Sequence, residues 1–232
     1  MSILMRKKLV ELLDDLSVDK YKKLEELKNV SETLNRPDVI WHLLLCSMST
    51  MGNTRGYKGL IENQDNYNKV SFKTLSRCLP EQRYLILQDT LKAAKVRMPL
   101  KKASYLNENF KIIEKMGGVE EARELAFSQK GMDAKIKFLK QFQGIGSKYA
   151  RNIWMDIYHP DFYNNIAIDE RIKKITKILG YEFKNYADHE NFYLDIAKEA
   201  GLQGWELDRL LYQFNNEFVE ALKKEKNRLI HV

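Results

Sequence analysis

The sequence predicts an all-α protein. It contains only 4 prolines and 11 glycines in 232 residues, and its abundance of Leu, Lys, Glu, Ala and Ile favours helices over a turn-rich β fold. Apolar residues also recur at helical spacing along most of the chain. A hydrophobic content of 44%, including 11% aromatic residues, can fill the core of one large domain or two small ones.

The expected helices follow one another with few breaks. Residues 3–30 read as an amphipathic helix or helix pair, with leucines on one face and charges on the other. A strongly buried helix begins after Pro37, where Asp38 is suited to cap it. Residues 51–69 contain three glycines and several asparagines, so we expect a loop there. Further helices are expected at 71–78, 80–95, 101–116, 118–128, 133–142, 147–158, 169–179, 188–200 and 205–222, followed by a frayed lysine-rich tail.

Charge and apolar patterning narrow the class of protein. The net charge is +7 and the pI is near 9.1, which favours a polyanionic partner such as nucleic acid, although other lysine-rich proteins share this excess. The N-terminus is charged within its first ten residues, and no window approaches 18 uncharged apolar residues. We therefore expect an intracellular protein without a membrane partner.

The metal-ligating residue types are sparse. Two cysteines, Cys46 and Cys78, cannot by themselves build a cysteine-rich zinc site or hold a cubane iron–sulfur cluster. The four histidines lack the HxxxH and HExxH spacings of metal-binding helices. The sequence thus predicts no metal centre, no iron–sulfur cluster and no required cofactor.

The stretch FQGIGSKYARNIW, residues 142–154, predicts a helix, a tight turn and a second helix that starts at Ser147. Gly144 and Gly146 flank Ile145 in the turn. Glycines reach positive φ without penalty, and they leave backbone N–H groups open to an anion at the positive end of the second helix. The alternative is that the GxG turn only joins two helices.

Lys148 and Asp169 are the candidate catalytic residues. Lys148 lies in the first turn of the second helix, where the helix dipole disfavours a cation but would help a lysine nucleophile. An ordinary amine pKa of about 10.4 leaves few neutral amines at pH 7, so we expect burial and the positive end of the helix to lower the pKa of this amine. Asp169 stands 21 residues on (169 − 148) and can cap the next helix. Beside a nucleophilic amine, it can also accept a proton or stabilise a cationic transition state.

These residues resemble the motifs of the helix-hairpin-helix DNA glycosylase superfamily. FQGIGSKYA fills the place of the family's hairpin LPGxGxKxA, and IAIDERI fills that of its apolar loop ending in an aspartate. Upstream, KKASYLNENFKIIEKMGG resembles the helix before the hairpin, and WHLLLCSMSTMGNTRGYKGLI resembles the early buried helix with its DNA-facing loop. The resemblance covers roughly residues 40–182.

The resemblance implies one glycosylase domain, residues 1–232, made of two helical subdomains with a cleft between them. The central subdomain, about 50–165, would contain the hairpin, and both termini, about 1–49 and 166–232, would build the other. Lys148 would be the catalytic lysine of the bifunctional members, which excise a damaged base and cut the strand, and Asp169 the catalytic aspartate. Gly144, Ile145, Gly146 and Ser147 would grip DNA phosphate, at a hairpin that in family members often binds a monovalent cation.

The sequence also departs from the family pattern. Gln143 stands where a proline is usual, and Arg171 where a histidine is common. The family's wedging glutamine has no clear counterpart in the early loop, where Asn53 or Met51 could replace it. The four C-terminal cysteines of the iron–sulfur branches are absent.

The closing segment NFYLDIAKEAGLQGWELDRLLYQF resembles the last helices of the type-2 8-oxoguanine DNA glycosylase/AP lyases, although this chain shows no lysine at its end. The resemblance implies an oxidised purine such as 8-oxoguanine as substrate. A carbonyl near Gly52 is a candidate acceptor for the base's N7 hydrogen, and Trp41 and Trp205 are candidates for the base pocket or, alternatively, for the core.

The expected protein is a monomeric base-excision-repair enzyme that acts on double-stranded DNA in the cytoplasm, at the nucleoid. Two alternatives stay open. In a monofunctional glycosylase for alkylated or mismatched bases, Asp169 would activate water and Lys148 would be incidental. In a DNA-binding protein without chemistry, the hairpin would only grip the backbone.

Overall fold

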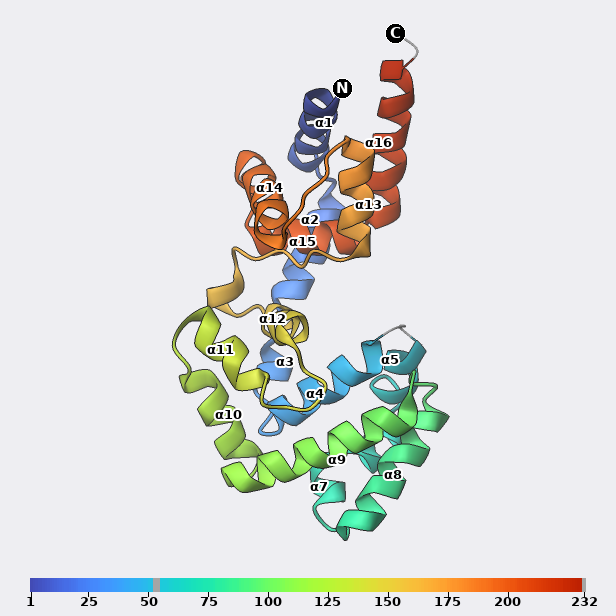
Figure 1. Cartoon of the computed structure of the whole chain (residues 1–232), viewed down its shortest axis with the longest axis vertical. Coiled ribbons are helices and arrows are strands. Elements are labelled where there is room, and N and C mark those ends of the chain that lie inside the picture. The colour runs from blue at the N-terminus through green and yellow to red at the C-terminus, as the bar shows by residue number, and fades with distance from the viewer. Residues whose placement is uncertain (52–54, 231–232) are drawn as a thin grey trace. The chain divides into compact units, whose positions relative to one another are not determined.

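A computed structural model describes residues 1–51 and 55–230 (Figure 1). These residues form helices and connecting turns, and no β-strand occurs among them. The predicted all-α class is therefore confirmed. No helix within the described ranges combines the length and apolar character needed to cross a membrane.

The helices are short to medium in length and follow one another closely. In chain order they are α1 (Ser2–Asp14), α2 (Val18–Lys28), α3 (Ser31–Leu34), α4 (Val39–Thr50), α5 (Arg55–Leu60), α6 (Gln64–Lys69), α7 (Phe72–Leu75), α8 (Pro80–Ala93), α9 (Pro99–Met116), α10 (Val119–Ser128), α11 (Gly131–Leu139), α12 (Ser147–Asp156), the 3₁₀ helix η1 (Pro160–Phe162), α13 (Glu170–Leu179), α14 (Tyr186–Glu199), α15 (Gly204–Gln213) and α16 (Asn215–Ile230).

The chain divides into two compact units. The central unit is residues 31–153, and the terminal unit is residues 1–30 together with 154–232, so both chain ends contribute to the same unit. The boundaries expected from the family resemblance lie later, near residues 50 and 165. In the structure the second change falls inside α12, whose first turns belong to the central unit.

The core of the central unit forms around Trp41 on α4. Its ring is fully buried and meets Phe72 and Phe110 edge-on, at centroid distances of 5.8 and 5.7 Å. Its indole N–H donates to the carbonyl of Val70 at 2.9 Å, which satisfies a buried donor. Helices α8 and α9 pack along each other, and α4 and α10 both contact α9.

The terminal unit is a cluster of helices from both ends of the sequence. Helix α16 packs against α1 and α13, and α14 contacts α1 and α15 (Figure 1). Trp205 on α15 is 1% exposed, and its indole N–H donates to the carbonyl of Met155 at 2.7 Å. Its own backbone N–H donates to Tyr163 at 2.8 Å, which ties α15 to the segment before Asp169.

The expected loop at 51–69 is wrong for its described part, which forms α5 and α6. Gly56 and Gly59 lie inside α5 because the helix approaches other backbone closely. A Cβ on Gly56 would stand 2.5 Å from the carbonyl oxygen of Ser49, and one on Gly59 would stand 2.3 Å from that of Ala94. These glycines permit close packing and do not break the helix.

Three further expectations differ in detail. The single helix expected at 205–222 is two helices, α15 and α16, and α16 continues to Ile230 where a frayed tail was expected. Asp38 occupies the position before α4, but its side chain makes no capping bond and instead pairs with Arg36 at 2.9 Å. Of the two alternatives for residues 3–30, one helix or a pair, the structure shows the pair, α1 and α2.

Candidate active site

The hairpin joins α11 to α12 through a turn that depends on one of its two glycines. Gly144 adopts a φ of +82°, and a Cβ there would meet Met48 Cε and Tyr105 Cδ2 at 2.7 Å. Gly146 does not have a positive φ, and a Cβ on it would meet nothing within 4 Å. The expectation of positive φ therefore holds for Gly144 and is wrong for Gly146. The space next to Gly146, at the start of α12, is therefore not filled by other residues of the described part of the chain.

A buried asparagine on α9 holds the turn in place. Asn109 is fully buried, and its Nδ2 donates to the carbonyl of Gln143 at 3.1 Å. The N–H of Gln143 in turn donates to Asn109 Oδ1 at 2.6 Å. A proline at position 143 would have no N–H to give, so the departure from the family's proline is matched by a specific partner. The sequence signal was a polar residue on the apolar face of KKASYLNENFKII.

Lys148 lies in the first turn of α12, directly after this turn. Both Lys148 and Ser147 are exposed, whereas Ile145 is 4% exposed and anchors the turn in the core. Lys148 makes no hydrogen bond or ion pair with another residue of the described ranges. The predicted burial of its amine is wrong, because the side chain is exposed. The first N–H groups of a helix have no acceptor within the helix, so they are available to an anion at this exposed end.

Asp169 is the capping residue of α13, as its position predicts. Its Oδ1 accepts the N–H groups of Arg171 at 2.8 Å and Ile172 at 3.1 Å. Its Oδ2 accepts from the Arg171 guanidinium at 3.2 Å, and that guanidinium lies over the ring of Tyr212 at 4.1 Å. These bonds fix the direction of the carboxylate. The side chain of Asp169 is 28% exposed, so it is still open to solvent on one side.

The extended segment before Asp169 is held by side chains from α14 and α15. Three consecutive backbone N–H groups, those of Ile166, Ala167 and Ile168, donate to side-chain acceptors at 3.1, 2.8 and 3.4 Å respectively; these acceptors are Glu190 Oε1, Asp208 Oδ1 and Tyr186 Oη. Tyr186 also donates to the carbonyl of Ile166 at 2.8 Å. Asp208 lies in the closing segment NFYLDIAKEAGLQGWELDRLLYQF, where no local pattern in the sequence points to this contact.

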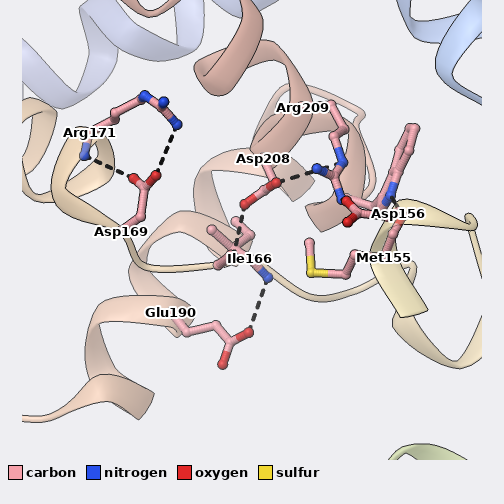
Figure 2. Close-up of polar contacts among 10 residues, drawn as sticks. Met155, Asp156, Ile166, Asp169, Arg171, Glu190, Asp208 and Arg209 are labelled. Carbon is pink, nitrogen blue, oxygen red and sulfur yellow. Dashed lines mark hydrogen bonds and ion pairs between the residues drawn. The ribbon is translucent and has the colours of Figure 1, made fainter. Parts of the chain in front are cut away.

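Asp208 is the buried member of this group of charges. Its side chain lies 3.9 Å from Arg209, which also pairs with Asp156 at 3.0 Å (Figure 2). Burial raises the pKa of the Asp208 carboxyl to about 6, while Arg209 and the N–H of Ala167 act in the opposite direction. The carboxyl is therefore mostly ionised at pH 7 but close to its titration range.

The predicted base pocket needs correction. The rings of Trp41 and Trp205 are 0% and 1% exposed, and each is packed in the core of its own unit with its indole N–H satisfied. Neither offers a free face to a base, so both are core residues. Gly52 and Asn53, the other candidates from the early loop, lie outside the described residues. Met51 directly follows α4 as its C-terminal capping residue, and its carbonyl accepts from the buried amine of Lys102 at 2.9 Å.

The described part of the chain contains no group of three or more His, Cys, Asp or Glu side chains placed to hold a metal ion. Cys46 and Cys78 are not joined in a disulfide. The monovalent cation at the hairpin, which the family resemblance implies, stays a prediction.

The described part of the chain combines an all-helical architecture with a glycine turn between α11 and α12. No protein-family model matches the sequence, and a comparison with curated proteins found no significant sequence match. The similarity appears at the level of solved structures.

Those structures are 8-oxoguanine DNA glycosylases. One is the Methanocaldococcus jannaschii 8-oxoguanine glycosylase/lyase in complex with 15mer DNA containing 8-oxoguanine, with a TM-score of 0.62 and 20% identity over 88% of this chain and 93% of that one. The 8-oxoguanine DNA glycosylase of Thermotoga maritima gives a TM-score of 0.62 and 17% identity, over 89% and 95% of the two chains. A further structure of the M. jannaschii enzyme gives 0.61 and 19%, over 91% and 92%. The predicted fold is therefore confirmed.

Proposed function

We propose that this protein is a base-excision-repair DNA glycosylase with AP lyase activity, which removes an oxidised purine such as 8-oxoguanine from double-stranded DNA. The observation that carries the proposal is the exposed amine of Lys148, directly after a glycine turn, on a fold shared with 8-oxoguanine glycosylases. The exposed Gly146 and the first turn of α12 supply the phosphate grip.

The proposed chemistry uses one nucleophile and one carboxylate. The Lys148 amine attacks C1′ of the flipped nucleotide, the bond to the base breaks, and the base leaves with the electron pair and is protonated. Asp169 stabilises the positive charge that develops on the sugar and takes a proton from the amine. The C1′–O4′ bond then breaks, O4′ takes a proton and the lysine nitrogen forms a Schiff base with C1′. Loss of a C2′ proton from this Schiff base eliminates the 3′ phosphate, which cuts the strand.

The position of Asp169 suits a carboxylate that stabilises charge. Two backbone N–H groups and Arg171 fix its direction, so little reorganisation is needed when the sugar cation forms. Arg171 replaces the histidine common in the family and is itself held by Tyr212. We assign Arg171 to orienting the carboxylate.

The proposal includes further features of the family. The partner is a duplex with a damaged base, the protein acts as a monomer in the cytoplasm at the nucleoid, and a monovalent cation bound at the hairpin carbonyls would help hold the phosphate. The basic charge of the chain supports a DNA partner.

Borohydride trapping tests the function. Reduction of the Schiff base should join the wild-type protein covalently to an 8-oxoguanine duplex, and Lys148→Gln should abolish this product because an amide cannot form the imine. Lys140→Gln is the matched control, since it removes one exposed lysine from the same hairpin and should leave trapping intact. A panel of duplexes, each with one lesion, identifies the base released.

The two rival functions give different results in the same assay. Base release without trapping by the wild type would favour the monofunctional glycosylase. DNA binding that is unchanged by Lys148→Gln, with no base release from any duplex, would favour the binding protein without chemistry.

A further inference from the structure

The segment that delivers Asp169 has no regular secondary structure to fix it. Ile166 and Ile168 are buried, and the segment runs extended up to the first turn of α13. A buried backbone N–H must find an acceptor, because leaving it unpaired is costly. Here the three N–H groups before Asp169 have side-chain acceptors, Glu190, Asp208 and Tyr186. We call these three residues the amide clamp.

Asp208 forms the shortest of the three bonds, 2.8 Å to the N–H of Ala167, two residues before Asp169. It comes from α15, 41 positions further along the chain, so it ties the delivering segment to a separate helix. Asp208 is 7% exposed, and the charged groups that face it are Arg209, Asp156 and Asp169. Burying a carboxylate is costly unless it is well hydrogen-bonded. We therefore expect the Asp208 carboxylate to have a specific role that an apolar side chain of similar size could not fill.

The carboxylate of Asp169 has little freedom of its own. Its Oδ1 is bonded to the first turn of α13, so its position follows the backbone at the end of the clamped segment. A shift of that backbone would move the carboxylate relative to the sugar, and a misplacement of about 1 Å can lower a rate by about 100-fold.

We propose that Asp208 is a positioning residue for base excision: through its hydrogen bond to the N–H of Ala167 it holds the extended segment that places the Asp169 carboxylate. Asp208 does not touch the substrate in this scheme. The inference rests on the proposed glycosylase function and deepens it, since it adds a third carboxylate to the excision step.

Two substitutions at position 208 separate the hydrogen bond from the charge. Asp208→Ala removes the acceptor and should slow single-turnover release of 8-oxoguanine by about 10- to 100-fold, with little change in affinity for the duplex. Asp208→Asn keeps an acceptor oxygen for Ala167 and should restore the rate to within a few-fold of wild type. Asp156→Asn is the matched control, because it removes the other carboxylate on Arg209 and should leave the rate unchanged.

A double variant shows whether Asp208 acts through Asp169. Residues that work as one unit are not additive, so Asp208→Ala combined with Asp169→Asn should be no slower than Asp169→Asn alone. Trapping on DNA that already carries an abasic site depends on the Lys148 amine and should be largely retained in Asp208→Ala.

Tyr186→Phe keeps the inference testable if Asp208→Ala does not fold. This exposed tyrosine loses only the hydroxyl that bonds Ile166 and Ile168, and base release should slow by about 3- to 10-fold. Circular dichroism melting shows which variants are folded. Any one of three results overturns the inference while the proposed function stands. Folded Asp208→Ala could release base at the wild-type rate, or Asp208→Asn could be as slow as Asp208→Ala. In the double variant, the rate of base release could fall by the product of the two single-variant effects. A wild type that neither releases a base nor is trapped overturns both.

Discussion

Gly144 and Gly146 are separated by one residue and have different physical roles. Gly144 is required by the backbone, since it has a φ of +82° and stands against Met48 and Tyr105. Gly146 is not strained and has no neighbour within 4 Å of its Cβ direction. The sequence predicted the turn, because GxG between two amphipathic helices is a strong pattern. It could not assign the positive φ, because that depends on what packs against the turn.

Gly144→Ala should destabilise the protein. An alanine at positive φ and in contact with two side chains should lower the free energy of unfolding by about 2 kcal/mol. Urea denaturation, followed by circular dichroism, measures this change. A variant as stable as the wild type would mean that the turn can relax without loss.

Gly146→Val should leave the fold intact and weaken DNA binding. A valine side chain finds open space in the free protein but would occupy the approach to the first turn of α12. Fluorescence anisotropy with a labelled duplex measures the affinity, and the urea midpoint serves as the control for folding. Normal binding by this variant would show that the hairpin is not the phosphate grip.

Asp208 also predicts a pH dependence of stability. Its pKa is raised from 3.8 to about 6 by burial, so the folded protein binds the proton more tightly than the unfolded chain. The stability from this group is fully present below about pH 4 and is lost as pH rises through about 6. The free energy of unfolding of wild type, taken relative to Asp208→Asn, should therefore fall between pH 4 and 6. A constant difference between the two proteins would contradict the raised pKa.

At the scale of elements, local pattern predicted most helices and failed where distant contacts decide. The helices from α8 to α12 lie close to their expected ranges because their apolar spacing and caps are local signals. The sequence did not predict helix α5, because glycines such as Gly56 and Gly59 are typical of loops. In the structure these two glycines allow the helix to pack closely against the backbone of Ser49 and Ala94. The Asn109 contact to Gln143 spans 34 positions, so a polar residue on the apolar face of α9 marks the position but does not reveal its partner.

Asn109→Ala should loosen the hairpin. The substitution removes both hydrogen bonds to Gln143 and leaves a cavity on a fully buried face of α9. The expected loss of stability is about 1–3 kcal/mol, and DNA affinity should fall with it because the turn is no longer held. Asn107→Ala, a change on the same helix at a half-buried position, is the control. If Asn109→Ala bound DNA normally, the turn would be held by its own backbone.

At the scale of the whole molecule, the family resemblance predicted two helical subdomains, one of them built from both chain ends. The chain divides into two compact units, residues 31–153 and residues 1–30 together with 154–232. The resemblance pointed to Lys148 and Asp169 as candidates because each lies within a short local motif. The amide clamp could not be found in this way, since its members come from α14 and α15 and meet the delivering segment only in the folded chain. Long-range contacts of this kind need a structure.

The charge of the whole chain makes a last prediction. With a net charge of +7 and a phosphate grip made of backbone amides, binding to undamaged duplex should be mainly electrostatic and independent of base sequence. If about six phosphates are neutralised, the affinity should fall by about 1000-fold between 50 and 200 mM salt. A titration of labelled duplexes of several sequences measures this slope, and a neutral solute at matched osmolarity is the control. The release of counterions from DNA drives the electrostatic part of the affinity. An affinity that does not change with salt would therefore contradict an electrostatic contribution, and the hairpin contacts alone would have to account for binding.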